Sequence, residues 1–205
     1  MLDKITESLT NKIRNEMPEI DDERAEVINY SLQIFLGEFP KLFIMLGIAY
    51  ILGILKLTLI TFLILLPYRT FSGGFHLKTH IGCIISTCLF YCGVTILAKT
   101  IVLNNIIKFS FIIATFIFGI VMIKLYAPAD TEEVPILSKK VRKQKQILSY
   151  VFLTLGLIIA AIIKNNIISN MIIFGYIAQT FMITRLAYNL TNNRYGYEVY
   201  ENASN

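Results

Sequence analysis

One short segment carries both histidines of the chain and one of its three cysteines. It runs Arg69-Thr-Phe-Ser-Gly-Gly-Phe-His76-Leu-Lys-Thr-His80-Ile-Gly-Cys83. A cysteine near a histidine suggests a thiolate nucleophile with an imidazole as its general base. A free thiol has a pKa of about 8.5, so a nearby imidazole or cation must favour the thiolate. We take Cys83 as the candidate nucleophile and His76 as the candidate base, with Arg69 supplying positive potential or holding a substrate carboxylate.

The spacing of His76 and Cys83 restricts how the pair could meet. Seven residues of straight helix separate two Cα atoms by about 10.5 Å, whereas a hydrogen bond needs roughly 3–3.5 Å between heavy atoms. The Gly-Gly pair at 73–74 indicates irregular backbone, so we expect a helix to begin near Thr79 and His76 to fold back over its first turn. His80 lies three residues before Cys83 on the same side and is an alternative base. A further alternative is that His76 acts on Cys83 of a second chain in a dimer.

Several of these residues have a simpler, non-catalytic explanation. A lone cysteine in an apolar helix is usually a small packing residue, which describes Cys88 and Cys92. Three clustered cysteines are not a disulfide framework. His76, His80 and Cys83 offer three zinc ligand types, but the glutamate base of an H-E-x-x-H hydrolase is missing. We therefore expect no metal and no cofactor.

A second stretch of interest is Tyr126-Ala-Pro-Ala-Asp-Thr-Glu-Glu-Val-Pro-Ile136, followed by a basic run over 138–146. Asp130 and Glu132 could orient a base or bind a peptide. The basic run could attract anionic lipid head groups or an acidic peptide segment. Its candidate binding residues are Lys139, Lys140, Arg142 and Lys143. The competing interpretation is a solvated loop whose charges only set the orientation in a membrane.

Composition indicates that a bilayer surrounds these segments. Of the 205 residues, 55% are hydrophobic and 16% charged, against roughly 45–50% and 25% in soluble domains. The net charge is +5, but the cations stand at the ends of apolar blocks, so we expect no nucleic-acid partner. No repeated ten-residue alternation appears, which argues against a barrel. The sequence predicts an all-α, polytopic integral membrane protein.

The apolar blocks predict about six membrane segments. Four are clear by length: 81–98, 106–126, 147–163 and 165–184. The stretch 27–66 must hold two more passes, or a re-entrant pair, that turn near Gly47–Gly53. Residues 1–26 have apolar residues at helical spacing and predict an amphipathic helix at the membrane surface or against the rest of the protein. Residues 27–205 form a single transmembrane catalytic domain in this interpretation.

Lysine and arginine in the loops set the expected orientation. The loop 127–146 carries five of them and is expected in the cytosol. Counting spans from it places the loop 67–80 and the tail 186–205 on the same side. The polar opening segment is also expected there, so both termini and the candidate active site face the cytosol.

Together these residues resemble the accessory gene regulator protein B (AgrB) family of Gram-positive bacteria. The likeness lies in Arg69…Gly74-Phe-His76-x6-Cys83 at the start of a span and in Ala-Pro-Ala-Asp130-Thr-Glu after a later one. The size, the span pattern and the basic loop also match.

The resemblance implies a cysteine endopeptidase of quorum sensing in the bacterial cell membrane. Such an enzyme cuts the C-terminal tail of a small peptide precursor of the AgrD type and works as a homodimer. By analogy Cys83 forms an acyl thioester, His76 protonates the leaving amine, and Arg69 and Gly74 support them. A thiol of the precursor then displaces Cys83 and closes a thiolactone ring. Apart from the resemblance, irregular backbone at 72–75, which includes Ser72, Gly73 and Gly74, could supply N–H donors for the oxyanion.

Two other functions remain alternatives to a peptidase. A small peptide transporter would place charges in a cavity at mid-membrane, whereas 81–98, 147–163 and 165–184 hold none. A non-catalytic membrane assembly protein would tolerate replacement of Cys83 by alanine or serine.

Overall fold

The computed structural model of the chain describes residues 2–17, 20–77, 79–132, 135–136 and 138–201. These residues form helices and connecting turns, with two isolated β-bridges between loops. The helices are α1 (Leu2–Glu16), α2 (Asp22–Ile51), α3 (Leu55–Ser72), α4 (His80–Thr100), α5 (Asn105–Tyr126), α6 (Lys139–Ile162), α7 (Asn166–Met182), α8 (Arg185–Leu190) and α9 (Gly196–Glu201). The predicted all-α class is confirmed.

Four helices are long and apolar enough to cross a membrane: α3, the part of α4 from Ile81, α5 and α6. The remaining two expected segments are shorter. The apolar end of α2 spans Phe39–Ile51, and α7 has 17 residues, at the lower limit for a crossing helix. α7 contacts α3, α4, α5 and α6, so it is the central helix of the bundle.

The stretch 27–66 folds as two helices joined by a short turn, as the span count predicts. α2 ends at Ile51 and α3 begins at Leu55. The turn between them has Gly53 at φ 66°, a backbone conformation that favours glycine. Lys56 is exposed in the first turn of α3, so it lies beside the turn and not within the pass.

The two expected loops are shorter than predicted. The loop expected over 67–80 spans only 73–79, because α3 continues through Pro67 to Ser72 and buries Tyr68 in the core. The loop expected over 127–146 ends at Ser138, whose side chain caps α6 at the backbone N–H of Val141. The basic run therefore forms the first two turns of α6. The tail is likewise not extended, since it contains α8 and α9.

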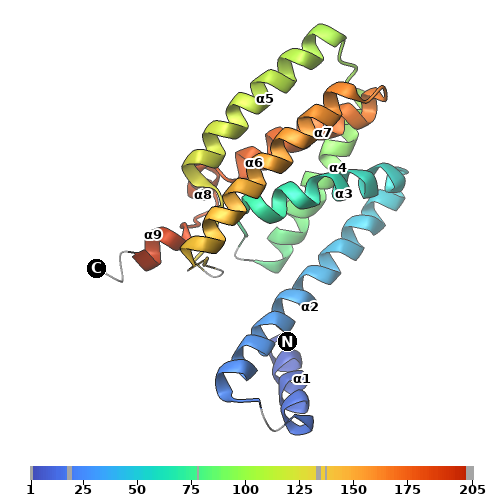
Figure 1. Cartoon of the computed structure of the whole chain (residues 1–205). Helices are drawn as coiled ribbons and strands as arrows, with labels where there is room; N and C mark the ends of the chain where they lie inside the picture. Colours follow the sequence, from blue (N-terminus) through green and yellow to red (C-terminus); the bar gives the residue numbers. More distant parts are fainter. Residues whose placement is uncertain (1, 18–19, 78, 133–134, 137, 202–205) are drawn as a thin grey trace.

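The N-terminal helix is present, but its apolar stripe does not pack on the rest of the chain. Figure 1 shows α1 and the first half of α2 projecting away from the bundle. Thr6 and Thr10 are buried, whereas Ile5, Leu9 and Met17 are exposed. α1 instead packs against α2 through the face that carries Thr6 and Thr10, so the contact it makes is with the rest of the protein.

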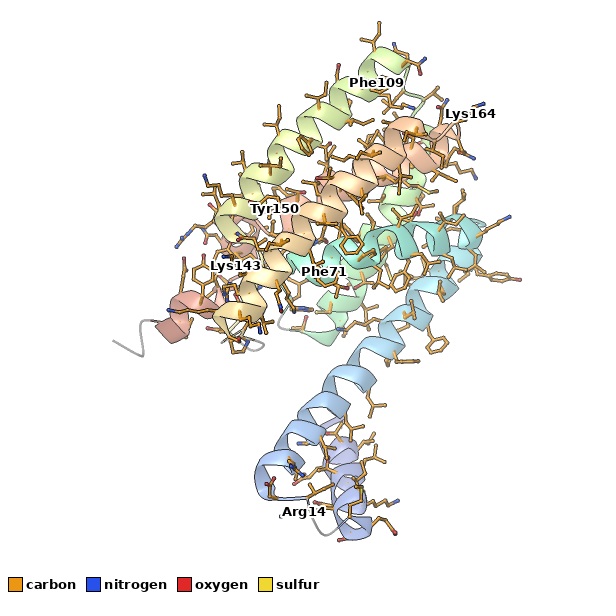
Figure 2. All side chains as sticks on the ribbon, viewed as in Figure 1. Arg14, Phe71, Phe109, Lys143, Tyr150 and Lys164 are labelled. Carbon is orange, nitrogen blue, oxygen red and sulfur yellow. The ribbon has the colours of Figure 1, made fainter. Side chains whose placement is uncertain are left out.

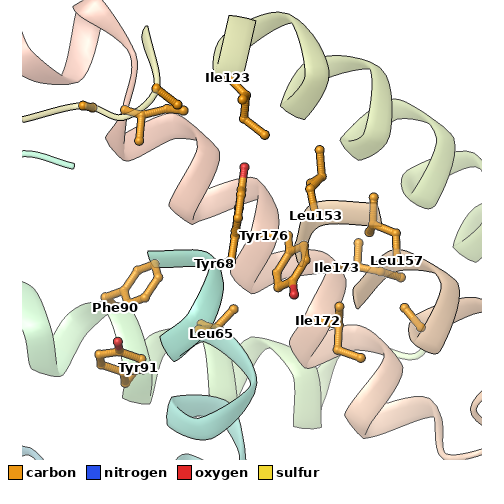
Figure 3. Packing of buried hydrophobic residues seen from close by; sticks show 14 of the residues in the cluster. Leu65, Tyr68, Phe90, Tyr91, Ile123, Leu153, Leu157, Ile172, Ile173 and Tyr176 are labelled. Carbon is orange, nitrogen blue, oxygen red and sulfur yellow. The ribbon is translucent and has the colours of Figure 1, made fainter. Parts of the chain in front are cut away.

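The bundle core lies where α3, α5, α6 and α7 meet. Leu65, Ile123, Leu153 and Ile173 are fully buried there, and the centroids of the Tyr68 and Tyr176 rings lie 4.8 Å apart. Figure 3 shows these side chains together in the core. Neutral polar pairs also join helices, such as the Tyr68 and Thr180 hydroxyls at 2.8 Å. Because lipid offers no hydrogen-bond partners, buried polar groups must pair within the protein.

Close helix contacts in this core depend on glycine. A Cβ on Gly119 would come within 2.5 Å of Leu153. A Cβ on Gly175 would come equally close to Leu65, and one on Gly156 would overlap the Tyr176 hydroxyl. That hydroxyl donates a hydrogen bond to the Phe152 carbonyl. Small residues thus let α5, α6 and α7 approach one another, as is common in membrane bundles.

We expect Gly156→Ala to destabilise the protein by about 1–3 kcal/mol, because the methyl group displaces Tyr176 from its pocket and its hydrogen bond. Thermal unfolding of the purified protein in detergent measures the change. Gly93→Ala is the matched control, since a Cβ there meets nothing within 4 Å. Equal midpoints for the two variants would contradict the packing argument.

Candidate active site

The loop after α3 is fixed by backbone pairing with the loop after α5. Ala129 donates its N–H to the Ser72 carbonyl at 2.8 Å, and Gly74 donates to the Ala129 carbonyl at 2.9 Å. Gly73 has φ 75°, and a Cβ there would overlap the Ala129 carbonyl. Only glycine fits this position. The pairing places the two segments of interest in the sequence, 69–83 and 126–136, side by side.

Two of the candidate oxyanion donors already have acceptors within the protein. The Gly73 N–H donates to the Arg69 carbonyl, and the Gly74 N–H donates to Ala129. In this arrangement neither group is free to bind a substrate oxygen. Their evident role is to set the course of the chain toward His76.

Cys83 lies at the end of the first turn of α4, beneath the loop that carries His76. Thr79 caps the helix by accepting a hydrogen bond from the Gly82 N–H at 3.1 Å. The Cys83 thiol donates to the Leu77 carbonyl at 3.1 Å. The Leu77 carbonyl therefore lies over the start of the helix, while the predicted approach of the His76 imidazole to Cys83 stays a prediction. Cys83 is half-buried, and His76 is exposed.

Leu77, the residue after His76, is thus in hydrogen-bond contact with the candidate nucleophile Cys83. The main-chain carbonyl of His76 accepts a hydrogen bond from the Asn193 side chain at 2.8 Å. Lys78 and the side chain of the alternative base His80 lie outside the described residues. Cys88 is half-buried and Cys92 is buried further along α4, as expected of packing cysteines.

Arg69 is held by α7 and does not extend into solvent. Its Nη1 donates to the Gln179 side-chain oxygen at 3.1 Å and contacts the Met182 sulfur. The Gln179 amide nitrogen in turn donates to the Ser72 hydroxyl and the Gly73 carbonyl. Buried Gln179 is therefore the residue that joins the supporting positions 69, 72 and 73. Sequence reasoning missed it, although an amide within the uncharged span 165–184 was a usable signal.

Asp130 and Arg142 form a pair that fastens the second loop to α6. Arg142 Nη2 lies 2.6 Å from Asp130 Oδ2, and the Asp130 side chain is only 1% exposed. The same Oδ2 accepts the Ile136 N–H, and Arg142 Nη1 donates to the Pro128 carbonyl. These contacts give both residues a structural role. Three other candidate substrate-binding residues, Lys139, Lys140 and Lys143, are exposed on the surface.

The C-terminal tail closes the site from the other side, which the sequence did not predict. The buried Tyr188 hydroxyl donates to the Asp130 carbonyl, and the Tyr195 hydroxyl donates to the Ile183 carbonyl. Their rings stack 4.0 Å apart, and Arg142 lies over the Tyr197 ring. Burial raises the pKa of both the Tyr188 and the Tyr195 phenol above the usual range, so they remain neutral donors.

Two hollows lie in this region, and the first of them borders the His76 loop. An apolar groove of about 490 Å³ runs between the loop, α4 and the end of α7. Among its lining residues are Phe75, Leu77, Gly82, Leu89 and Met182. A polar pocket of about 610 Å³ lies on the tail side. It is lined by Glu132, Asn189, Asn192, Asn193 and Arg194. Among the described residues, histidine, cysteine, aspartate and glutamate side chains form no cluster of three or more that could hold a metal ion.

Comparison with known proteins identifies the family of this chain. The profile of the family described as Accessory gene regulator B matches residues 6–183. The chain belongs to this family. An AgrB-like protein of Listeria monocytogenes serotype 4a is 31% identical over 186 residues, 88% of each chain. An AgrB-like protein of Listeria innocua is 32% identical over the same shares.

A relative from Staphylococcus aureus strain JH9, named accessory gene regulator protein B, is 32% identical over 136 residues. That match covers 66% of this chain and 70% of the relative. No solved structure matches. This AgrB-family chain is therefore a membrane protein of the quorum-sensing accessory gene regulator type. The family profile ends at residue 183, so α8, α9 and Asn193 lie beyond it.

We expect Arg142→Ala to destabilise this AgrB-family protein by on the order of 3 kcal/mol, because it leaves the Asp130 carboxylate buried without its cation. Thermal unfolding in detergent measures the loss. Arg185→Ala serves as the control. It removes an arginine from an exposed pair with Glu198, and such pairs contribute about 0–1 kcal/mol. Equal losses in the two variants would show that burial of the Asp130 pair carries no special weight.

Proposed function

We propose that this protein is a cysteine endopeptidase that cleaves the C-terminal tail of an AgrD-like precursor and promotes cyclisation of the remaining peptide. One observation carries the proposal. In a chain of the AgrB family, the half-buried Cys83 thiol lies directly beneath the folded-back loop that bears His76. The apolar groove beside it offers room for a peptide.

In the proposed reaction Cys83 Sγ attacks the scissile carbonyl, and the thiol proton passes to His76. The C–N bond breaks, His76 protonates the leaving amine, and the precursor remains as an acyl thioester on Cys83. A thiol of the precursor then attacks that thioester. This step forms the thiolactone and returns Cys83 as a free thiol. Because one thioester replaces another, ring closure depends on holding the two ends together and excluding water.

The proposal includes an orientation with the site at the cytosolic face. The His76 loop, the start of α6 and the tail share one end of the bundle, and the turns at 52–54, 101–104 and 163–165 share the other. Figure 2 shows Lys143 and Lys164 at these opposite ends. Lysines and arginines concentrate at the Lys143 end, which the positive-inside rule assigns to the cytosol. A homodimer is part of the same proposal and rests on the family resemblance.

The test of the nucleophile uses the full-length protein in lipid vesicles and a synthetic peptide with the sequence of the AgrD-type precursor encoded beside its gene. Mass spectrometry should find an acyl adduct on Cys83. Cys83→Ala and His76→Ala should abolish the adduct, because one lacks the nucleophile and the other the base. Cys88→Ala, a half-buried cysteine on the same helix, should keep it. Unchanged processing in Cys83→Ala would exclude the cysteine mechanism, and loss only in His80→Ala would transfer the base to that residue.

We propose that the exposed lysines of α6 attract the acidic tail of the precursor. Replacing Lys139, Lys140 and Lys143 together by glutamate reverses these charges. The peptide concentration for half-maximal cleavage should then rise about tenfold at low salt. High salt should reduce the difference, because exposed charges are screened. Lys164→Glu, at the other end of the bundle, is the control. An equal loss with a peptide whose tail carries no charge would contradict the electrostatic role.

A further inference from the structure

We propose that Asn193 is a positioning residue for the candidate base: its side-chain amide holds the His76 loop over Cys83 while the thiol proton leaves. The inference rests on the proposed function and extends it to the C-terminal tail. It assigns a specific task to a residue that lies beyond the part of the chain matched by the family profile.

Two consecutive carbonyls of the loop are held from different directions. The His76 carbonyl accepts from Asn193 Nδ2 at 2.8 Å. The next carbonyl, that of Leu77, accepts from the Cys83 thiol at 3.1 Å. The pairing with Ala129 fixes the chain as far as Gly74, and residues 75–77 beyond it lie in no helix or strand. External contacts must therefore fix the peptide groups that flank the His76 ring.

The two contacts respond differently to the reaction. The bond to the Leu77 carbonyl uses the thiol proton, so it disappears once Cys83 becomes a thiolate, and the negative sulfur then repels that carbonyl. The bond from Asn193 uses an amide proton that does not titrate. It therefore persists through nucleophile activation and acylation, when the position of His76 matters most.

Asn193 is itself well placed to act as an anchor. Its backbone N–H donates to the Tyr188 carbonyl at 2.9 Å, and its Nδ2 also contacts the Thr191 hydroxyl at 2.9 Å. Tyr188 is 1% exposed, and its hydroxyl reaches the Asp130 carbonyl. The amide is thus connected to the buried Asp130 region and not only to a surface turn. A side chain already fixed by such contacts loses little entropy when it binds the loop.

The test measures the reactivity of Cys83 toward iodoacetamide in full-length protein in vesicles, with mass spectrometry to locate the adduct. Alkylation needs the thiolate, so its rate against pH reports how well His76 promotes ionisation, without any precursor. At neutral pH, Asn193→Ala should lower the rate about tenfold, as expected for one lost hydrogen bond. It should also shift the profile to higher pH, toward that of His76→Ala.

Asn189→Ala is the matched control. This exposed asparagine lies in the same tail and lines the same polar pocket, and the described contacts do not connect its side chain with the loop. Its profile should match the wild type. Asn193→Gln, which keeps the amide donor, should recover part of the rate. A profile for Asn193→Ala equal to that of the wild type would overturn the inference.

A double variant separates positioning from a merely structural role. If Asn193 acts through His76, adding Asn193→Ala to His76→Ala should cause no further loss of reactivity. Additive losses would overturn the inference and leave the proposed function intact. If His76→Ala itself leaves the alkylation profile unchanged, the proposed base fails and the inference fails with it.

Discussion

The pairing of Gly73 and Gly74 with Ala129 is the constraint on which the rest of the site depends. Two short backbone hydrogen bonds join the loop after α3 to the loop after α5, and the close approach requires a glycine at position 73. Once the loops are joined, the chain beyond Gly74 must pass over the start of α4. That course brings the Leu77 carbonyl onto Cys83.

Each neighbouring element strengthens this junction from its own side. Gln179 on α7 binds the Gly73 carbonyl and Arg69. Arg142 on α6 binds Asp130, the residue after Ala129. The tail contributes Tyr188 at the Asp130 carbonyl. Because these contacts are buried or half-buried, the loss of one partner leaves the other unsatisfied, which costs more than the bond itself contributes.

The division of labour among the charged residues follows from burial. Arg69 and Arg142 face protein partners, and planar guanidinium groups suit such fixed, multiply bonded positions. Lys139, Lys140 and Lys143 remain exposed on the first turns of α6. Their charges are therefore available to lipid or peptide, and salt should weaken their effects. Between α3 and α4 the buried polar contact is a neutral hydroxyl pair, Thr61 with Thr95.

The sequence by itself determined the helical class and the turn near Gly53. These features follow from local rules: apolar length and glycine at positive φ. Tertiary structure alone decided where the two loops end, that Asp130 and Arg142 are partners, and that Gln179, Tyr188 and Asn193 border the site. Such partners lie 12 to 117 residues apart, so only the packing of the bundle could bring them together.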